Sequence, residues 1–250
     1  MAPVLETVGL VKRFGGITAA SDVSLRVARG ARHALIGPNG AGKTTLVNLL
    51  TGMLRPTEGR ILLDGQDITG TEAYTRVHLG LARTFQINQL FGELTPIEAI
   101  GLAVSERMGS GRDWWRLAGG KPEVVEEVGQ LIEQFHLGDV MSLPTAILPY
   151  GKQRLLEIAL AIACRPRVLL LDEPAAGVPE AERHEILAAV ARLPKDVTVV
   201  LIEHDMDLVF SFADRISVLV NGTLFVEGAP EQVARDARVK AVYLGEALDD

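Results

Sequence analysis

The residues best suited to do chemistry lie at positions 37–44, which read Gly-Pro-Asn-Gly-Ala-Gly-Lys-Thr. This stretch follows the pattern G-x-x-x-x-G-K-[ST], in which a glycine-rich loop cradles the phosphates of a nucleotide. Residues 32–36 read as a strand and residues 45–50 as a helix, so the loop is predicted to form a strand-to-helix turn. The free amides of the helix N-terminus then point at the ligand. The alternative, a glycine turn with a surface lysine, is disfavoured by these flanking elements.

The residues of this loop have separate expected roles. Gly40 and Gly42 allow the backbone to take positive φ and to approach the phosphates closely. Lys43 adds a positive charge at the β- and γ-phosphate oxygens, and Thr44 offers its hydroxyl to Mg²⁺. The loop residues predicted to bind the nucleoside triphosphate are Asn39, Gly40, Ala41, Gly42, Lys43, Thr44 and Thr45.

Two adjacent acids follow a short apolar run at residues 168–171. Such a run is typical of a strand buried on both faces, and its carboxyl end is where α/β sheets place their ligand sites. Asp172 is suited to organise Mg²⁺ through its water shell, and Glu173 to orient the water that attacks the γ-phosphate. A solvated acidic turn is the alternative for the dipeptide alone, but the phosphate loop favours the catalytic interpretation.

A histidine and a glutamine are further candidates at the same edge. The apolar run 197–202 delivers His204 there, where a neutral imidazole can contact the γ-phosphate and hold the attacking water. Gln86 follows Phe85 at the entry to a mainly helical region, and its amide can bridge the metal or the water. A surface glutamine is the alternative for Gln86, and a histidine without a functional role is the alternative for His204.

Composition and charge limit the classes of protein. The chain has 250 residues, 48% of them hydrophobic, which suits a well-buried core. The net charge of −7, with no basic run, argues against a nucleic-acid partner. The single cysteine, Cys164, lies in an apolar helical stretch and is expected to be a free packed thiol, compatible with a reducing cytoplasm. We expect neither a signal peptide nor a segment able to cross a bilayer.

The pattern along the chain predicts an α/β fold with three parts. Half-exposed strands at 6–11, 23–28 and 59–64 indicate a small antiparallel sheet, and the runs 168–171 and 197–202 indicate buried parallel strands. Between them the chain is mainly helical, with helices opening at Pro96, Pro122 and Gly151 and a loop at 105–121. Asn221-Gly222 is predicted to join two strands as a hairpin over residues 217–227, followed by a short helix after Pro230. We expect one nucleotide-binding domain over residues 1–250, with a core at about 1–87 and 164–250 and an inserted helical subdomain at about 88–163.

Together these motifs resemble the ATP-binding cassette family, the motor subunits of ABC transporters. Five signals stand in the order of that family: Walker A at 37–44, the Q-loop at Gln86, the signature at 148–153, Walker B at 168–173 and the switch histidine at His204. The resemblance implies a P-loop NTPase (RecA-like) core with an antiparallel β subdomain and an inserted α-helical subdomain. It also implies ATP hydrolysis with Mg²⁺, and adenine stacking on Phe14, for which a core residue at a strand end is the alternative.

In this family two cassettes close head to tail, so the resemblance implies that Tyr150, Gly151 and Lys152 face the nucleotide held by the partner. The signature of this chain differs from the usual L-S-G-G-Q, because Pro149, Tyr150 and Lys152 replace the serine, the first glycine and the glutamine. Lys152 in a first helical turn opposes the macrodipole, from which we infer compensation by the partner's phosphates or ribose. Pro179 stands where the D-loop usually has an aspartate or asparagine.

Several stretches are similar to the ATP-binding subunits that energise branched-chain amino acid uptake, among them Arg13-Phe14-Gly15-Gly16, Arg83-Thr84-Phe85-Gln86 and residues 202–206. This implies a second cassette, identical or different, and transmembrane permeases that insert short helices in a groove beside Gln86 and the helical insert. It also implies an indirect solute-binding protein and a place on the inner face of the cell membrane. Trp114 and Trp115 either belong to the docking surface or pack under their own loop. Related cassettes for urea, amides or lipopolysaccharide, a soluble ABC ATPase and a non-enzymatic ATP sensor are the alternatives.

Overall fold

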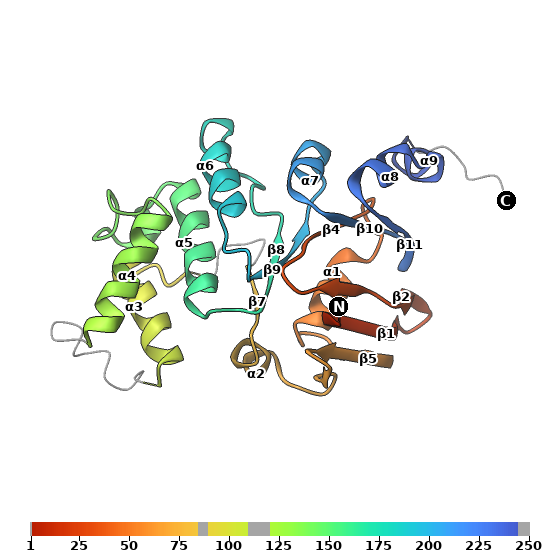
Figure 1. Cartoon of the computed structure of the whole chain (residues 1–250), viewed down its shortest axis with the longest axis horizontal. Helices are drawn as coiled ribbons and strands as arrows, with labels where there is room; N and C mark the ends of the chain where they lie inside the picture. Colours follow the sequence, from red (N-terminus) through yellow and green to blue (C-terminus); the bar gives the residue numbers. More distant parts are fainter. Residues whose placement is uncertain (1, 85–89, 110–120, 245–250) are drawn as a thin grey trace. The chain divides into compact units, whose positions relative to one another are not determined.

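The computed structural model describes residues 2–84, 90–109 and 121–244 (Figure 1). Contacts between residues group the chain into two compact units. The first consists of residues 1–83, 167–173 and 194–250, and the second of residues 84–166 and 174–193. No helix in the described part of the chain is long and apolar enough to cross a membrane.

The first unit contains a six-stranded sheet in the order β11-β10-β4-β9-β8-β7. All neighbours pair in parallel except β10 and β11, which form the predicted hairpin. Every residue of β8 and β9 is buried, which confirms the prediction drawn from their continuous apolar runs. The strands are β4 (Arg32–Ile36), β7 (Leu81–Arg83), β8 (Val168–Asp172), β9 (Thr198–Ile202), β10 (Arg215–Val220) and β11 (Thr223–Gly228).

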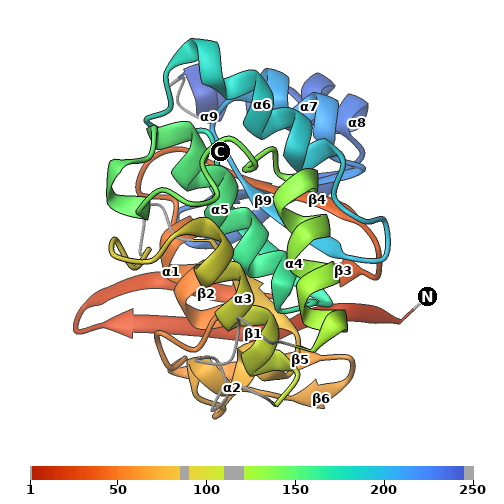
Figure 2. The same cartoon turned by 90° about the vertical axis from the view of Figure 1, so that its left-hand side faces the viewer.

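An antiparallel sheet of the same unit runs in the order β2-β1-β5-β6, with β3 also paired to β1 (Figures 1 and 2). Its strands are β1 (Pro3–Phe14), β2 (Ile17–Val23), β3 (Arg26–Ala28), β5 (Glu58–Leu63) and β6 (Gln66–Asp67). The single strand predicted over residues 23–28 is divided. The hydroxyl of Thr7 donates to the carbonyl of Val23 at 2.8 Å and accepts from the N–H of Leu25 at 2.8 Å, so a side chain satisfies the backbone where the ladder is interrupted.

The helices of the first unit pack around these sheets. They are α1 (Lys43–Leu50), α2 (Ala73–His78), α7 (Met206–Phe212), α8 (Pro230–Arg235) and α9 (Ala237–Leu244). Arg76 of α2 is only 1% exposed, and its guanidinium donates to the carbonyls of Leu49 and Leu50 at 2.8 and 2.6 Å. These carbonyls lie in the last turn of α1. The carbonyl of Leu49 also accepts from the N–H of Gly52 at 3.2 Å, and the buried cation adds a partner to both carbonyls and complements the helix dipole.

The second unit is helical in the described residues, with α3 (Pro96–Arg107), α4 (Pro122–Gln134), the 3₁₀ turn η2 (Thr145–Ile147), α5 (Tyr150–Ala163) and α6 (Glu180–Ala191). Figure 2 shows α3, α4 and α5 lying side by side. Thr95 and Glu98 form a capping box at the start of α3, and Pro96 and Pro122 stand at helix beginnings as predicted. The loop expected from residue 105 begins later, because α3 continues to Arg107 with Ser105 buried. Contacts group α6 with these helices, and the boundaries of the predicted helical subdomain stay a prediction.

Candidate functional site

The glycine-rich loop joins β4 to α1, which are the strand and helix predicted to flank it. Gly42 is the N-cap of α1 and has a φ of 98°, a conformation that a side chain disfavours. A Cβ atom at Gly42 would also lie 2.5 Å from the carbonyl oxygen of Ala19. Gly40 has a φ of 80° with nothing near the position of a Cβ atom, so its requirement is conformational alone. The backbone therefore takes the form that exposes amides at the start of α1.

Lys43 is held by the loop that precedes it. Its Nζ atom donates to the carbonyl oxygens of Gly37 and Pro38 at 2.6 and 3.1 Å. Burial lowers the pKa of Lys43 from its ordinary value, and the negative charges of Glu173 and Asp172 oppose that change. The lysine and the two acids, far apart in sequence, therefore share one electrostatic environment.

The other loop residues predicted to bind the nucleotide differ in exposure. Asn39, Gly40 and Thr44 are exposed, Gly42, Lys43 and Thr45 are half-buried, and Ala41 is buried. An exposed hydroxyl at Thr44 and the carboxylate of Asp172 are hard oxygen donors of the kind that Mg²⁺ takes. Within residues 2–84, 90–109 and 121–244, no three His, Cys, Asp or Glu side chains gather as a metal site. The hydroxyl of Thr44 and the carboxylate of Asp172 fit Mg²⁺, which is usually held by one or two protein oxygens together with water and phosphate oxygens.

Asp172 ends β8, and Glu173 follows it with a φ of 47°. Positive φ is uncommon for glutamate, and such conformations cluster at functional sites. The N–H of Glu173 donates to the carbonyl of Ile202 at 2.9 Å, which ties the turn to the end of β9. His204 lies just beyond β9, and its Nδ1 atom is 3.6 Å from Oε1 of Glu173. The structure therefore brings the catalytic candidates Glu173 and His204 together at the carboxyl edge of the sheet.

Glu203 also lies at this edge and is not among the predicted site residues. It is 2% exposed, and its Oε2 accepts from the backbone N–H groups of His204 and Asp205 at 2.9 and 3.3 Å. The same oxygen lies 3.6 Å from Nδ1 of His204. Burial raises the pKa of Glu203, while these two amides act in the opposite direction. An acid directly after a buried strand was the available signal, since Asp172 and Glu173 were found by that rule.

Phe14 ends β1 and is 47% exposed, so it is not a core residue. The Nζ atom of Lys12 lies 5.0 Å from the centroid of its ring. An exposed aromatic ring offers a stacking surface, and the predicted contact with adenine stays a prediction.

The signature residues open α5 in the second unit. The N–H of Gly151 donates to Oε2 of Glu182 at 2.9 Å. Nζ of Lys152 donates to the carbonyl of His136 at 2.7 Å and lies 3.2 Å from Oδ1 of Asp139. The charge of Lys152 is therefore compensated within its own unit, and not only by a partner as predicted from the sequence. Tyr150 has the guanidinium of Arg154 5.4 Å from its ring centroid. A role of Tyr150, Gly151 and Lys152 toward a nucleotide stays a prediction.

Three of the predicted residues lie outside the described part of the chain. They are Gln86, Trp114 and Trp115. Their predicted roles are therefore not tested by the geometry.

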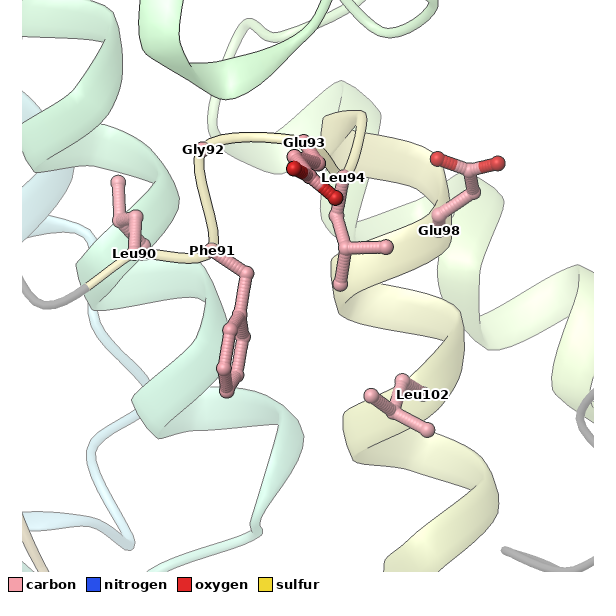
Figure 3. Close-up of a pocket in the computed structure, with 7 residues that line it drawn as sticks. All are labelled: Leu90, Phe91, Gly92, Glu93, Leu94, Glu98 and Leu102. Atoms are coloured by element: carbon pink, nitrogen blue, oxygen red, sulfur yellow. The ribbon is translucent and has the colours of Figure 1, made fainter.

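An apolar hollow of about 520 Å³ lies in the second unit, beside the start of α3. Figure 3 shows the side chains of Phe91, Leu94 and Leu102 turned toward it. Phe91 is 71% exposed, and Glu93 and Glu98 add negative charge at the rim. A large exposed apolar side chain beside a hollow lined by half-buried leucines is typical of a surface that another protein covers.

Comparison with known proteins identifies the family. The family model described as ABC transporter matches residues 20–176. The chain is 41% identical to the high-affinity branched-chain amino acid transport ATP-binding protein BraF of Pseudomonas aeruginosa, over 98% of this chain and 99% of that protein. It is 39% identical to the corresponding protein LivG of Escherichia coli K12, over 98% and 99% of the two chains. The crystal structure of the ADP conformation of an ATP-binding cassette of an ABC transporter has a TM-score of 0.83 and 33% identity, over 98% and 100% of the two chains. This chain belongs to the ABC transporter family, as one of its ATP-binding cassettes.

Proposed function

We propose that this chain is the ATP-hydrolysing subunit of an ABC importer for branched-chain amino acids. The observation that carries the proposal is the 41% identity, along almost the whole of both chains, to a transport ATP-binding protein for those solutes. The close approach of Glu173 to His204, in the same unit as the loop of Lys43, supports hydrolysis rather than nucleotide sensing alone. We take residues 1–250 as one nucleotide-binding domain.

Lys43 and the loop amides bind the phosphates of ATP, with Asn39, Gly40, Ala41, Gly42 and Thr45 around them. Thr44 and Asp172 are the residues that hold Mg²⁺, with Gln86 as a further ligand. When bound, the metal neutralises negative charge on the phosphate oxygens. Adenine stacks on the exposed ring of Phe14, where a purine needs only a flat apolar surface.

Glu173 orients the attacking water and accepts its proton. The water oxygen forms a bond to the γ-phosphorus, the bond from that phosphorus to the bridging oxygen breaks, and ADP leaves. His204 holds the γ-phosphate and the water by hydrogen bonds, and its neighbours Glu173 and Glu203 fix the position of the imidazole. Gln86 completes the water-binding set.

Partners complete the machine. A second cassette places its Tyr150, Gly151 and Lys152, or the equivalent residues of a different subunit, against the nucleotide of this chain. Transmembrane permeases dock a short helix in the apolar hollow of Phe91, Leu94 and Leu102, and a solute-binding protein delivers the solute to them. The chain then works as a peripheral protein on the cytoplasmic face of the membrane, without a nucleic-acid partner.

A reconstituted transport assay tests this proposal. The chain is coexpressed with candidate permease subunits, and uptake of radiolabelled leucine into proteoliposomes is measured with and without ATP. We expect ATP-dependent uptake that the Glu173→Gln variant abolishes, with that variant trapped as an ATP-bound dimer. If urea or an amide is taken up instead, or lipopolysaccharide is exported, the proposed ATPase role stands and the proposed solute is wrong. Full ATP turnover in Glu173→Gln would contradict the assigned chemistry.

A further inference from the structure

One largely buried cation of the first unit has no part in the roles described above. Arg83 is the last residue of β7, and its guanidinium group makes hydrogen bonds to two other elements. Nη2 donates to Oδ2 of Asp172 at 2.7 Å, and Nη1 donates to Oδ1 of Asn48 at 2.7 Å. The side chains of Arg83 and Asp172 are 10% and 7% exposed. The guanidinium therefore bridges the end of β8 and helix α1 inside the protein.

The register of the sheet explains why Arg83 reaches Asp172. β7 and β8 are parallel neighbours, and Arg83 is paired with Leu170. Asp172 lies two residues further along β8, so its side chain leaves the sheet on the same face as that of Leu170. Arg83 and Asp172 are thus diagonal neighbours on one face, within reach of a long side chain.

The second contact involves the helix that carries the phosphate-loop lysine and threonine. Asn48 lies four residues after Thr44 in α1, and residues with that spacing share one face of a helix. The guanidinium of Arg83 therefore connects Asp172, at the edge of the sheet, to the face of α1 that carries Thr44.

The chemistry of arginine makes this contact a rigid one. The guanidinium group is planar and always charged, so the directions of its two hydrogen bonds are fixed with respect to each other. Hydrogen bonds between charged groups are shorter and stronger than neutral ones. A buried carboxylate that loses its cation is strongly destabilised. Lys43 also interacts with Asp172 through its charge. Because Arg83 already neutralises Asp172, the charge of Lys43 remains available to bind the phosphates.

We propose that Arg83 is a positioning residue, which holds the carboxylate of Asp172 at a fixed place relative to Thr44 so that both are preorganised for Mg²⁺. This inference rests on the proposed function, which assigns the metal to those two residues. Mg²⁺ demands near-ideal octahedral geometry, so a displaced carboxylate weakens its binding more than it weakens binding of the nucleotide alone.

The test measures equilibrium binding by the full chain and does not depend on turnover. The dissociation constant for a fluorescent ATP analogue is determined in excess EDTA and in excess Mg²⁺, and the ratio of the two constants reports the benefit of the metal. In Arg83→Gln we expect the ratio to fall about 10-fold, the scale on which residues behind metal ligands act. Affinity in EDTA should stay within about twofold of the parent, because the loop that binds the phosphates is unchanged.

Two further variants separate positioning from charge. Arg83→Lys keeps the positive charge but not the fork, so we expect a ratio between those of the parent and Arg83→Gln. Arg167→Gln is the matched control, since Arg167 makes an ion pair with Asp64 at 2.8 Å but its side chain is 57% exposed. Its ratio should equal that of the parent.

The outcomes are distinguishable. A parental ratio in both Arg83 variants would overturn the inference, and so would an equal loss of affinity in EDTA and in Mg²⁺, which indicates a general structural role. If Arg83→Gln does not fold, Arg83→Lys decides by the same criterion. A parent chain that binds no ATP analogue in either condition would instead contradict the proposed function.

Discussion

The backbone N–H of Gly151 donates a hydrogen bond to the Glu182 carboxylate at 2.9 Å, so the amide that opens the signature helix has a partner within its own unit. A carboxylate at a helix N-terminus complements the helix dipole. It also occupies the amide of Gly151, a residue that the proposed function places against the nucleotide of the partner cassette. If a phosphate of that nucleotide binds this amide, Glu182 has to release it.

Gly151→Ala should destabilise the protein through this contact. The new Cβ atom would lie 2.3 Å from Oε2 and 3.1 Å from Cβ of Glu182, so the carboxylate must leave the amide. The lost hydrogen bond costs about 1–2 kcal/mol and the better helix propensity of alanine offsets up to about 1 kcal/mol of it, so we expect a net loss of about 1 kcal/mol or less in the free energy of unfolding, measured in urea.

Two other variants control that measurement. In a Glu182→Ala background the Gly151→Ala change should cost less, because the obstructing side chain is gone. Gly129→Ala, at a helical glycine of α4 with nothing within 4 Å of the new atom, should be neutral or stabilising. Equal costs of Gly151→Ala in both backgrounds would show that Glu182 is not the cause.

Stability should fall in mild acid because of His33. This residue of β4 is fully buried, with Nε2 2.8 Å from Oγ of Ser217. Burial lowers the pKa of His33 to about 4, against the smaller opposing effect of Glu227, while Arg215 adds to the lowering. In the unfolded chain His33 takes up a proton as the pH falls below its ordinary pKa of 6.5, whereas in the folded chain it does so only near pH 4. The contribution of neutral His33 to the free energy of unfolding is therefore fully present above pH 6.5 and is lost as the pH falls toward 4. The total loss is about 3 kcal/mol.

The measurement compares urea unfolding of the parent and His33→Asn between pH 4.5 and 7.5. Asparagine does not titrate, so the difference in the pH dependence of the two proteins isolates the histidine. Parallel curves for the two proteins would exclude His33 as the acid-sensitive group.

Phe14→Ala should weaken nucleotide binding and leave the protein folded. The ring is 47% exposed and contacts Lys12, so its removal should lower the free energy of unfolding by about 1–2 kcal/mol. Loss of a stacking surface for a base costs about 1–3 kcal/mol, which corresponds to roughly a 5- to 150-fold rise in the dissociation constant for ATP. Val8→Ala, also in β1 and 37% exposed, is the control and should bind as the parent does. An unaltered affinity for ATP in Phe14→Ala would show that Phe14 has no role in binding adenine.

Phe91→Ala should separate the chain from its permeases while leaving its nucleotide site intact. Phe91 lines the hollow of Figure 3 with a ring that is 71% exposed, and buried aromatic anchors contribute about 2 kcal/mol or more to protein interfaces. We expect co-purification with the permeases to fall by at least about 10-fold, with ATP affinity unchanged. Val125→Ala, 56% exposed outside that hollow, is the comparison variant. Identical recovery of permeases with both variants would argue against this hollow as the docking surface.

The motifs predicted the sheet edge well because they are local. The strand 32–36 and the hairpin turn at Asn221-Gly222 lie where the sequence placed them, and the helix predicted over 45–50 begins two residues earlier, at Lys43, since each depends on neighbouring residues alone. Buried runs predicted two central parallel strands, because a strand covered on both faces needs apolar residues throughout. That Asp172 and His204 end up at one edge follows from parallel strands in register.

The sequence by itself determined the family and the phosphate loop. It also determined which strands carry functional residues at their carboxyl ends, and which acids and histidine follow those strands. Only the tertiary structure decided which side chains hold those residues: Arg83 on Asp172 across 89 positions, Glu182 on Gly151 across 31, and a buried Glu203 beside His204. The physical reason is that such contacts depend on strand register and helix packing, which bring together residues whose local sequence carries no sign of each other.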